Sequence, residues 1–436
     1  MKFYIETFGC QMNENDTERI QYLLESSGYK KTDEIEASDI IILNTCTVRE
    51  SAKNRQYGHI GNLKKIKNLK KDILICIGGC AAQDLKEKII KDFPYVDIVF
   101  GTHNIADLPD LINRRISTGK SICSIENNGP DPGLFKVRRK HSFRALVSIT
   151  IGCDNYCSYC IVPSVRGNEI SIEEEKILEN IEKLVSDGVT EITLLGQNVN
   201  SYGKNLAEPC TFPELLRKIS DIKGLKRIRF MTSHPKDFSD ELIDVIKNSD
   251  NIVKHIHLPL QAGSDKILKE MNRNYTGRDY IGIIENIRIK IPDCAITTDI
   301  IVGFPGEEKE DFLRTLDIVK KVRFTRAFTF IYSPREGTRA SLMEDRVPLE
   351  EKKKWFRQLL EVQNAISFEE NNKLIGRKFE VLVDGSSPKN NALLEGRMEN
   401  NTIVNFEGES SLIGKIVPVI VTDARTFYVK GKLVQG

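Results

Sequence analysis

The sequence predicts a mixed α/β protein in three parts: an N-terminal doubly wound parallel-sheet domain, a central (β/α) barrel or part-barrel, and a small C-terminal β-barrel. Short apolar runs alternate with helical stretches up to about residue 115, and again from Phe143 to about Lys373. This alternation is the pattern of parallel β/α folds. From Lys373 onward, short strand-like segments are separated by Gly, Asn and Asp turns, as in small β-barrels.

The composition narrows the class of protein. The chain has 436 residues, of which 40% are hydrophobic and 29% charged, with a net charge of +2, as in soluble globular proteins. No apolar run approaches the roughly 18 residues of a membrane span, and the N-terminus lacks the pattern of a secretion signal. We therefore expect a cytoplasmic protein with no membrane partner. In that reducing compartment the 10 cysteines favour metal binding or catalysis where they cluster.

The first domain is expected at residues 1–118. Its expected strands are the apolar runs Lys2–Thr7, Asp39–Asn44, Ile73–Ile77 and Val96–Phe100. Its expected helices are Asn15–Ser27, Ser51–Leu69 and Ala82–Lys91. A linker at residues 119–138 follows, because Asn127–Phe135 is rich in Gly, Pro and Asn, which favour loops.

A basic strip begins at the end of this linker. Arg138, Arg139 and Lys140 belong to a segment with no acidic residue before Asp154. Such a strip is either a solvated connector or a surface that contacts nucleic-acid phosphates, and the sequence leaves both open.

The second domain is expected at residues 139–370. Its expected strands are Ala145–Ile151, Glu191–Leu195, Arg227–Met231, His255–Leu260, Ala295–Val302 and Ala327–Tyr332. Barrel enzymes build their sites at the carboxyl ends of such strands. Polar or small residues at those ends, together with Tyr159, are the candidate cofactor-binding residues: Gln197, Asn198, Ser233, Gln261, Gly303 and Tyr332. A charged helix is expected at Leu349–Lys373.

The third domain is expected at residues 373–436. Its expected strands are Lys378–Val383, Thr402–Phe406, Ile416–Val421 and Thr426–Lys432. Its own charges are too balanced to indicate a ligand.

Cys153, Cys157 and Cys160 form a CxxxCxxC motif directly after the first barrel strand. Three thiolates on a tight loop can bind three irons of a 4Fe–4S cluster. Because no fourth ligand lies nearby in the sequence, one iron stays open to an exogenous ligand. Zinc is the competing metal, but zinc ribbons usually need a second pair of ligands, which this motif lacks.

Cys10, Cys46 and Cys80 each follow a strand of the first domain. The carboxyl ends of parallel strands share one edge of a sheet, so these thiols can converge into a second three-cysteine cluster site. The alternative is that some are buried core thiols, as expected for Cys76. Cys123, Cys210 and Cys294 have no comparable placement and are expected to be structural.

The CxxxCxxC motif after a first barrel strand resembles the radical S-adenosylmethionine (SAM) superfamily. With the three-cysteine domain before it and a barrel similar to the TRAM domain after it, the whole chain resembles the methylthiotransferases of that superfamily. This resemblance implies two 4Fe–4S clusters and SAM as cofactors. It also implies that one SAM methylates sulfur at the auxiliary cluster, and that a second, cleaved at the Cys153–Cys160 loop, yields the radical that abstracts hydrogen from the substrate.

Three motifs resemble the branch that modifies isopentenyladenosine at position 37 of tRNA: Gly9–Asn13, Ser233–Phe238 and Met271–Thr276. The implied partners are the tRNA anticodon stem-loop, an electron donor such as a flavodoxin-type protein, and a sulfur or cluster supply protein. The chain itself is expected to be a monomer. After Arg166-Gly167 the chain departs from that branch, because Asn168–Ser171 stands where a basic run is usual. Alternative substrates are threonylcarbamoyladenosine in tRNA and a ribosomal-protein aspartate. A non-enzymatic RNA-binding protein with structural iron–sulfur or zinc sites is the alternative from another class.

Overall fold

The N-terminal domain is built on one parallel sheet. In the computed structural model, which describes residues 1–47, 50–126 and 136–434, its strand order is β2-β1-β3-β4-β5-β6. Every residue of β3 and β4 is buried, as expected for strands covered on both faces. The strands are β1 Lys2–Thr7, β2 Lys30–Lys31, β3 Ile40–Thr45, β4 Leu74–Gly79, β5 Ile98–Phe100 and β6 Ile122–Ser124.

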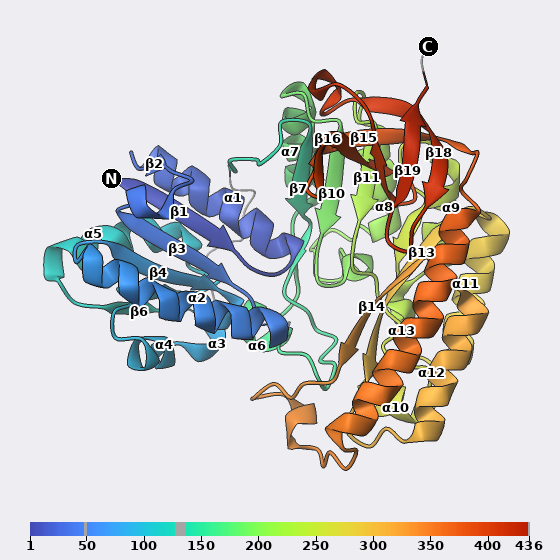
Figure 1. Cartoon of the computed structure of the whole chain (residues 1–436), viewed down its shortest axis with the longest axis horizontal. Helices are drawn as coiled ribbons and strands as arrows, with labels where there is room; N and C mark the ends of the chain where they lie inside the picture. The colour runs from blue at the N-terminus through green and yellow to red at the C-terminus, as the bar shows by residue number, and fades with distance from the viewer. Residues whose placement is uncertain (48–49, 127–135, 435–436) are drawn as a thin grey trace.

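Helices cover both faces of this sheet (Figure 1). α1 (Gln11–Ser26) and α5 (Leu108–Thr118) share one apolar cluster with the sheet. α2 (Glu50–Leu69), α3 (Cys80–Leu85) and α4 (Glu87–Asp92) cover the other face. The doubly wound sheet is therefore confirmed. Two of the expected helices differ in extent: α1 begins earlier, directly after Cys10, and the helix expected at Ala82–Lys91 is divided at Lys86, whose φ is 50°. α5 was not among the expected helices.

The central domain is an open part-barrel of parallel strands. Its two sheets, β7-β10-β11 and β12-β13-β14, are joined by a bridge between Ile228 and Ile252. The strands are β7 Arg144–Ser148, β10 Glu191–Leu195, β11 Arg227–Phe230, β12 His255–His257, β13 Ala295–Val302 and β14 Arg326–Ile331. The helices that follow them in turn are α7 Glu174–Ser186, α8 Phe212–Ser220, α9 Asp240–Asn248, α11 Gly277–Lys290 and α12 Lys309–Val322, with the shorter α6 Val162–Arg166 and α10 Asp265–Glu270 between strands.

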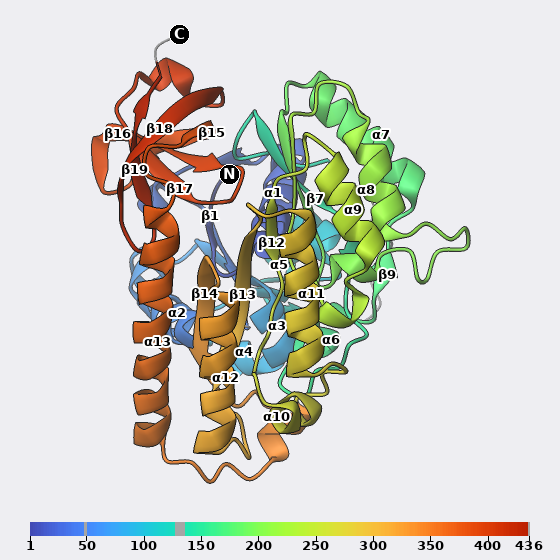
Figure 2. The same cartoon turned by 90° about the vertical axis from the view of Figure 1, so that its right-hand side faces the viewer.

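The C-terminal domain is a closed β-barrel of order β15-β16-β17-β19-β18. The long helix α13 (Leu349–Asn372) runs beside α12 and ends at this barrel (Figure 2). The strands are β15 Lys378–Ser387, β16 Asn390–Met398, β17 Ile403–Phe406, β18 Ile416–Ala424 and β19 Val429–Leu433. The small barrel is confirmed, although β16 was not among the expected strands. Within the described residues, no helix is long and apolar enough to cross a membrane.

Candidate functional site

The loop that carries Cys153, Cys157 and Cys160 is closed at its base by the antiparallel pair β8 (Thr150–Ile151) and β9 (Ile170–Ser171). Gly152 begins the loop with a φ of 74°, and a Cβ at this position would overlap the carbonyl oxygen of Asn168. Only glycine combines a positive φ with such a close approach of two backbone segments. Gly152 therefore fixes how the two ends of the cysteine loop meet.

The structure brings the three sulfurs of this loop together. Burial, followed by the charge of Cys157, raises the pKa of Cys160 to about 12, and Cys153 adds to the effect. Two side chains donate to the sulfurs: Asn155 Nδ2 lies 3.4 Å from Cys153 Sγ, and Arg273 Nη1 lies 3.6 Å from Cys157 Sγ. Donors near a sulfur stabilise the thiolate, the form that binds metal.

Arg273 was not expected as a site residue. It is buried, with Nε 3.0 Å from Tyr275 Oη and Nη2 3.1 Å from the carbonyl oxygen of Pro259. It belongs to the Met271–Thr276 motif, but nothing in that motif shows burial, because arginines are mostly exposed.

Four of the expected cofactor-binding residues carry buried polar atoms that have no partner in the described part of the chain. These atoms are Gln197 Oε1, Asn198 Oδ1, Ser233 Oγ and Tyr332 Oη. An unsatisfied buried polar atom costs about 1–3 kcal/mol. Polar atoms left without partners after β10, β11 and β14 fit a polar ligand at the mouth of the part-barrel, and such a ligand would offset this cost.

Gln261 and Gly303 have evident structural roles. Gln261 has a φ of 69°, donates its backbone N–H to Asp299 at 2.8 Å and accepts from Ile301 at 2.9 Å, so its backbone continues the sheet beside β13. The backbone N–H of Gly303 donates to the Glu307 carboxylate. A Cβ on Gly303 would overlap the methylenes of Lys352, so α13 can pack closely here only against glycine. Tyr159 is half-buried and packs against the core of the part-barrel.

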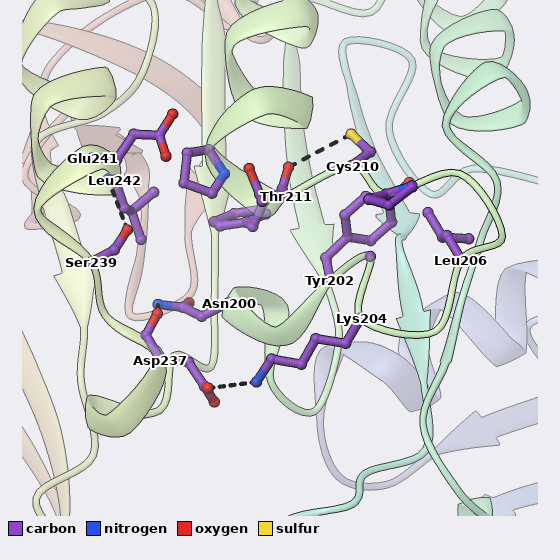
Figure 3. A pocket seen from close by; sticks show the side chains of 14 residues that line it. Asn200, Tyr202, Lys204, Leu206, Cys210, Thr211, Asp237, Ser239, Glu241 and Leu242 are labelled. Carbon is purple, nitrogen blue, oxygen red and sulfur yellow. Dashed lines mark hydrogen bonds and ion pairs between the residues drawn. The ribbon is translucent and has the colours of Figure 1, made fainter.

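A surface pocket of about 450 Å³ lies outside the part-barrel, between the loop after β10 and the start of α9. An ion pair of 2.6 Å joins Lys204 Nζ and Asp237 Oδ1 across it (Figure 3). Asp237 also accepts a hydrogen bond of 2.8 Å from Asn198 Nδ2. Asp237 therefore holds the Asn198 side chain in place and is itself paired with Lys204.

Cys10, Cys46 and Cys80 also converge. They follow β1, β3 and β4, which are adjacent and parallel. A Cβ on Gly9 would lie 2.7 Å from Cys46 Sγ, so glycine allows Cys46 to approach the turn before Cys10. Burial raises the pKa of Cys80 to about 11, and the charges of Cys46 and Cys10 contribute to the rise.

Neither set has the spacing of a single-ion site. Among the described residues, no three His, Cys, Asp or Glu side chains are placed to bind one metal ion.

A groove of about 880 Å³ is lined by all three domains. It reaches Gly9 and Gln11, which flank Cys10, and continues past the interior of the part-barrel to the C-terminal barrel. The basic residues that line it are Lys31, Arg138, Arg139, Lys140, Arg144, Arg229, Arg326 and Arg397; the acidic residues are Glu14, Glu18 and Glu191. Its lining is thus predominantly basic, although the whole chain is almost neutral.

The expected basic strip forms part of this groove. Backbone N–H groups of Arg138 and Lys140 donate to Glu18, which ties the strip to α1. Arg138 is 67% exposed and lies 3.4 Å from Glu25, while Arg139 lies 3.6 Å from Asp187. The strip therefore lies at the groove with Arg138 exposed, and its two arginines are each beside a carboxylate.

A three-cysteine loop at the mouth of a parallel part-barrel defines a radical SAM protein. Residues 147–319 match the Radical SAM superfamily, 372–434 match the TRAM domain, and 2–101 match the Uncharacterized protein family UPF0004. The radical SAM methyltransferase TsrM from Kitasatospora setae has a similar fold, with a TM-score of 0.56 at 15% identity, covering 75% of this chain and 72% of that one. The radical SAM enzyme OxsB has a TM-score of 0.52 at 12% identity, covering 82% and 56%.

Relatives are similar over nearly the whole chain. Proteins named tRNA-2-methylthio-N(6)-dimethylallyladenosine synthase are 48% identical in Acetivibrio thermocellus, covering 99% of this chain and 91% of that protein, and 47% identical in Carboxydothermus hydrogenoformans, covering 99% of each. The Clostridium perfringens protein of that name is 46% identical, covering 99% and 98%. The chain belongs to this family of radical SAM methylthiotransferases, and the expected resemblance is confirmed.

Proposed function

We infer that this chain adds a methylthio group to C2 of N6-dimethylallyl (isopentenyl) adenosine at position 37 of tRNA. The observation that carries this inference is the convergence of two three-cysteine sets in facing domains, with a basic groove leading to one of them. Relatives of 46–48% identity over 99% of the chain are named for this product. The C2–H bond carries no acidic proton and C2 has no leaving group, so acid–base catalysis has little to act on.

The residues present fit two 4Fe–4S clusters and SAM. We assign Cys153, Cys157 and Cys160 to the radical SAM cluster, and Cys10, Cys46 and Cys80 to an auxiliary cluster. When bound, these groups would supply reductive cleavage of SAM and a carrier for the sulfur that is methylated and transferred. Asn155 and Arg273 would stabilise the thiolates of the first set. The unpartnered atoms of Gln197, Asn198, Ser233 and Tyr332 would orient SAM, beside Tyr159, Gln261 and Gly303.

The groove fits a folded RNA. Arg138, Arg139 and Lys140 would contact phosphates of the anticodon stem, because phosphate contacts fix the position of an RNA without reading its sequence. Phe427, 54% exposed on the C-terminal barrel, lies 5.5 Å from the Arg326 guanidinium at the groove. Aromatic rings and guanidinium groups are the surfaces on which unstacked bases pack. The target base must leave its stack to reach the cysteine loops.

The electron for SAM cleavage must come from outside the chain. We therefore propose a flavodoxin-type electron donor. We also propose that another protein resupplies sulfur or the cluster, and that the chain works as a monomer in the cytoplasm.

Mass spectrometry of tRNA nucleosides from cells with and without this chain tests the proposed function. We expect the methylthio form of dimethylallyladenosine to disappear without the chain. Loss of methylthio from threonylcarbamoyladenosine instead would retain the chemistry and change the substrate. An unchanged nucleoside profile would overturn the proposal and favour a ribosomal-protein aspartate as the target.

A further inference from the structure

Arg166 is a buried arginine of the central domain that reaches into the N-terminal domain. It ends α6, the short helix that follows Cys160, and its side chain is only 6% exposed. Its Nη2 lies 2.7 Å from Asp16 Oδ2 and 2.9 Å from Asn13 Oδ1, while its Nε lies 3.3 Å from Cys80 Sγ. One guanidinium thus contacts a carboxylate, an amide and a cysteine of the other domain.

The acceptors of this guanidinium are themselves held in place. Asn13 Nδ2 donates to the carbonyl oxygens of Phe8 at 2.8 Å and Thr45 at 2.9 Å, which turns Asn13 Oδ1 toward Arg166. Asp16 is buried, with its side chain 3% exposed. Arginine suits this site because its rigid planar fork directs donors on separate nitrogens to separate acceptors, whereas all the donors of lysine share one nitrogen.

The position of Arg166 gives it an electrostatic effect on Cys80. A donor and a positive charge beside a thiolate ligand stabilise the more negative, reduced state of a cluster, and hydrogen bonds to the sulfurs are a recognised control of cluster potential. The carboxylate of Asp16 partly offsets this charge. Arg166 and Asp16 therefore have opposite effects on the same sulfur.

We propose that Arg166 is a positioning residue that holds Cys80 and raises the reduction potential of the auxiliary cluster, linking that site to the helix that leaves the Cys153–Cys160 loop. This inference rests on the proposed function, since it takes Cys10, Cys46 and Cys80 as cluster ligands.

The test uses the full chain carrying Cys153→Ala, Cys157→Ala and Cys160→Ala, so that the auxiliary cluster is the one observed. After reconstitution, the reduced fraction is measured by electron paramagnetic resonance at fixed potentials set with dithionite. Adding Arg166→Gln should lower the ratio of reduced to oxidised cluster about tenfold at a given potential, a shift of about 59 mV for one electron. Adding Asp16→Asn should shift the potential the other way, and loss of structure alone would not produce opposite shifts.

Arg115→Gln is the matched control, because Arg115 forms an ion pair of 2.6 Å with buried Asp97 in the same domain. It should leave the potential unchanged. If Arg166→Gln loses the cluster while its thermal unfolding matches that of Arg115→Gln, the positioning role is supported and Asp16→Asn still tests the potential. If the background variant binds no cluster, the proposed auxiliary site fails. If the background variant binds a cluster whose potential is unchanged by Arg166→Gln, by Asp16→Asn and by Arg115→Gln, the inference about Arg166 fails and the proposed function stands.

Discussion

Cys80 of the N-terminal domain and Ile161 of the part-barrel lie in one small apolar cluster, together with Val165. Ile161 directly follows Cys160, so this cluster joins the ends of the two cysteine sets. Thr102 Oγ1 donates to the carbonyl oxygen of Val165 at 2.7 Å and holds α6 against the N-terminal domain. The packing of the two domains therefore sets how the two cysteine sites face each other.

Removing the Ser233 hydroxyl is expected to stabilise the SAM-free protein and to weaken SAM binding. Its buried Oγ has no partner in the described residues, so Ser233→Ala should increase the free energy of unfolding by about 1 kcal/mol. The same change should raise the Kd for SAM about tenfold, about 1.4 kcal/mol. Urea denaturation and calorimetric titration of SAM measure the two effects.

Ser264→Ala is the control for Ser233→Ala, because the Ser264 hydroxyl already donates to Asp311 at 2.6 Å. It should lower the free energy of unfolding by about 1 kcal/mol and leave SAM binding unchanged. Identical behaviour of the two variants would contradict the assignment of Ser233 to SAM.

Gly152→Ala should abolish cluster binding at the Cys153–Cys160 loop while leaving the N-terminal site intact. The added Cβ would overlap the Asn168 carbonyl oxygen at the base of the loop. Gly188→Ala is the matched control, because Gly188 has a φ of 90° and nothing within 4 Å of an added Cβ. Iron analysis should show about half the iron of the wild type for Gly152→Ala and full iron for Gly188→Ala; equal contents would refute this role of Gly152.

Changing Arg138, Arg139 and Lys140 to glutamine should weaken tRNA binding and flatten its dependence on salt. Each lost phosphate contact should reduce the slope of log K against log[salt] by about 0.7–0.9. The control changes three other lysines to glutamine: Lys64, Lys65 and Lys71. These lysines are exposed and lie outside the groove lining, and their replacement removes the same charge. An unchanged slope in the strip variant, or an equal change in the control, would rule out phosphate contact by the strip.

Glu307→Gln should change the pH dependence of stability. Burial raises the pKa of Glu307 from 4.5 to about 7, so the folded state binds more protons than the unfolded state between these values. The wild type should therefore lose stability relative to Glu307→Gln as pH rises through this window, by up to about 3 kcal/mol. Urea denaturation of both proteins at pH 5 and pH 8 measures this difference; a gap that is the same at both pH values would contradict it.

The sequence predicted that Cys10, Cys46 and Cys80 converge because apolar runs locate parallel strands, and such strands end at one shared edge; it predicted the other set from the CxxxCxxC spacing. It did not predict the contacts of Arg166, whose partner Asp16 lies 150 positions away. Nor did it predict β16, in which the apolar residues do not outnumber the polar ones. Gly396 is needed there, since a Cβ would lie 2.5 Å from Val381 Cγ1 on the neighbouring strand β15. The edge strands β2 and β6 were too short to show a pattern.

The most direct test of the two-site account is the reaction of reconstituted Cys10→Ala/Cys46→Ala/Cys80→Ala protein with SAM, a reductant and tRNA bearing dimethylallyladenosine. Both 5′-deoxyadenosine and the methylthio nucleoside are measured by mass spectrometry. We predict that this variant still cleaves SAM to 5′-deoxyadenosine and forms no methylthio product. Methylthio product at the wild-type level would contradict the assignment of these three cysteines to sulfur transfer.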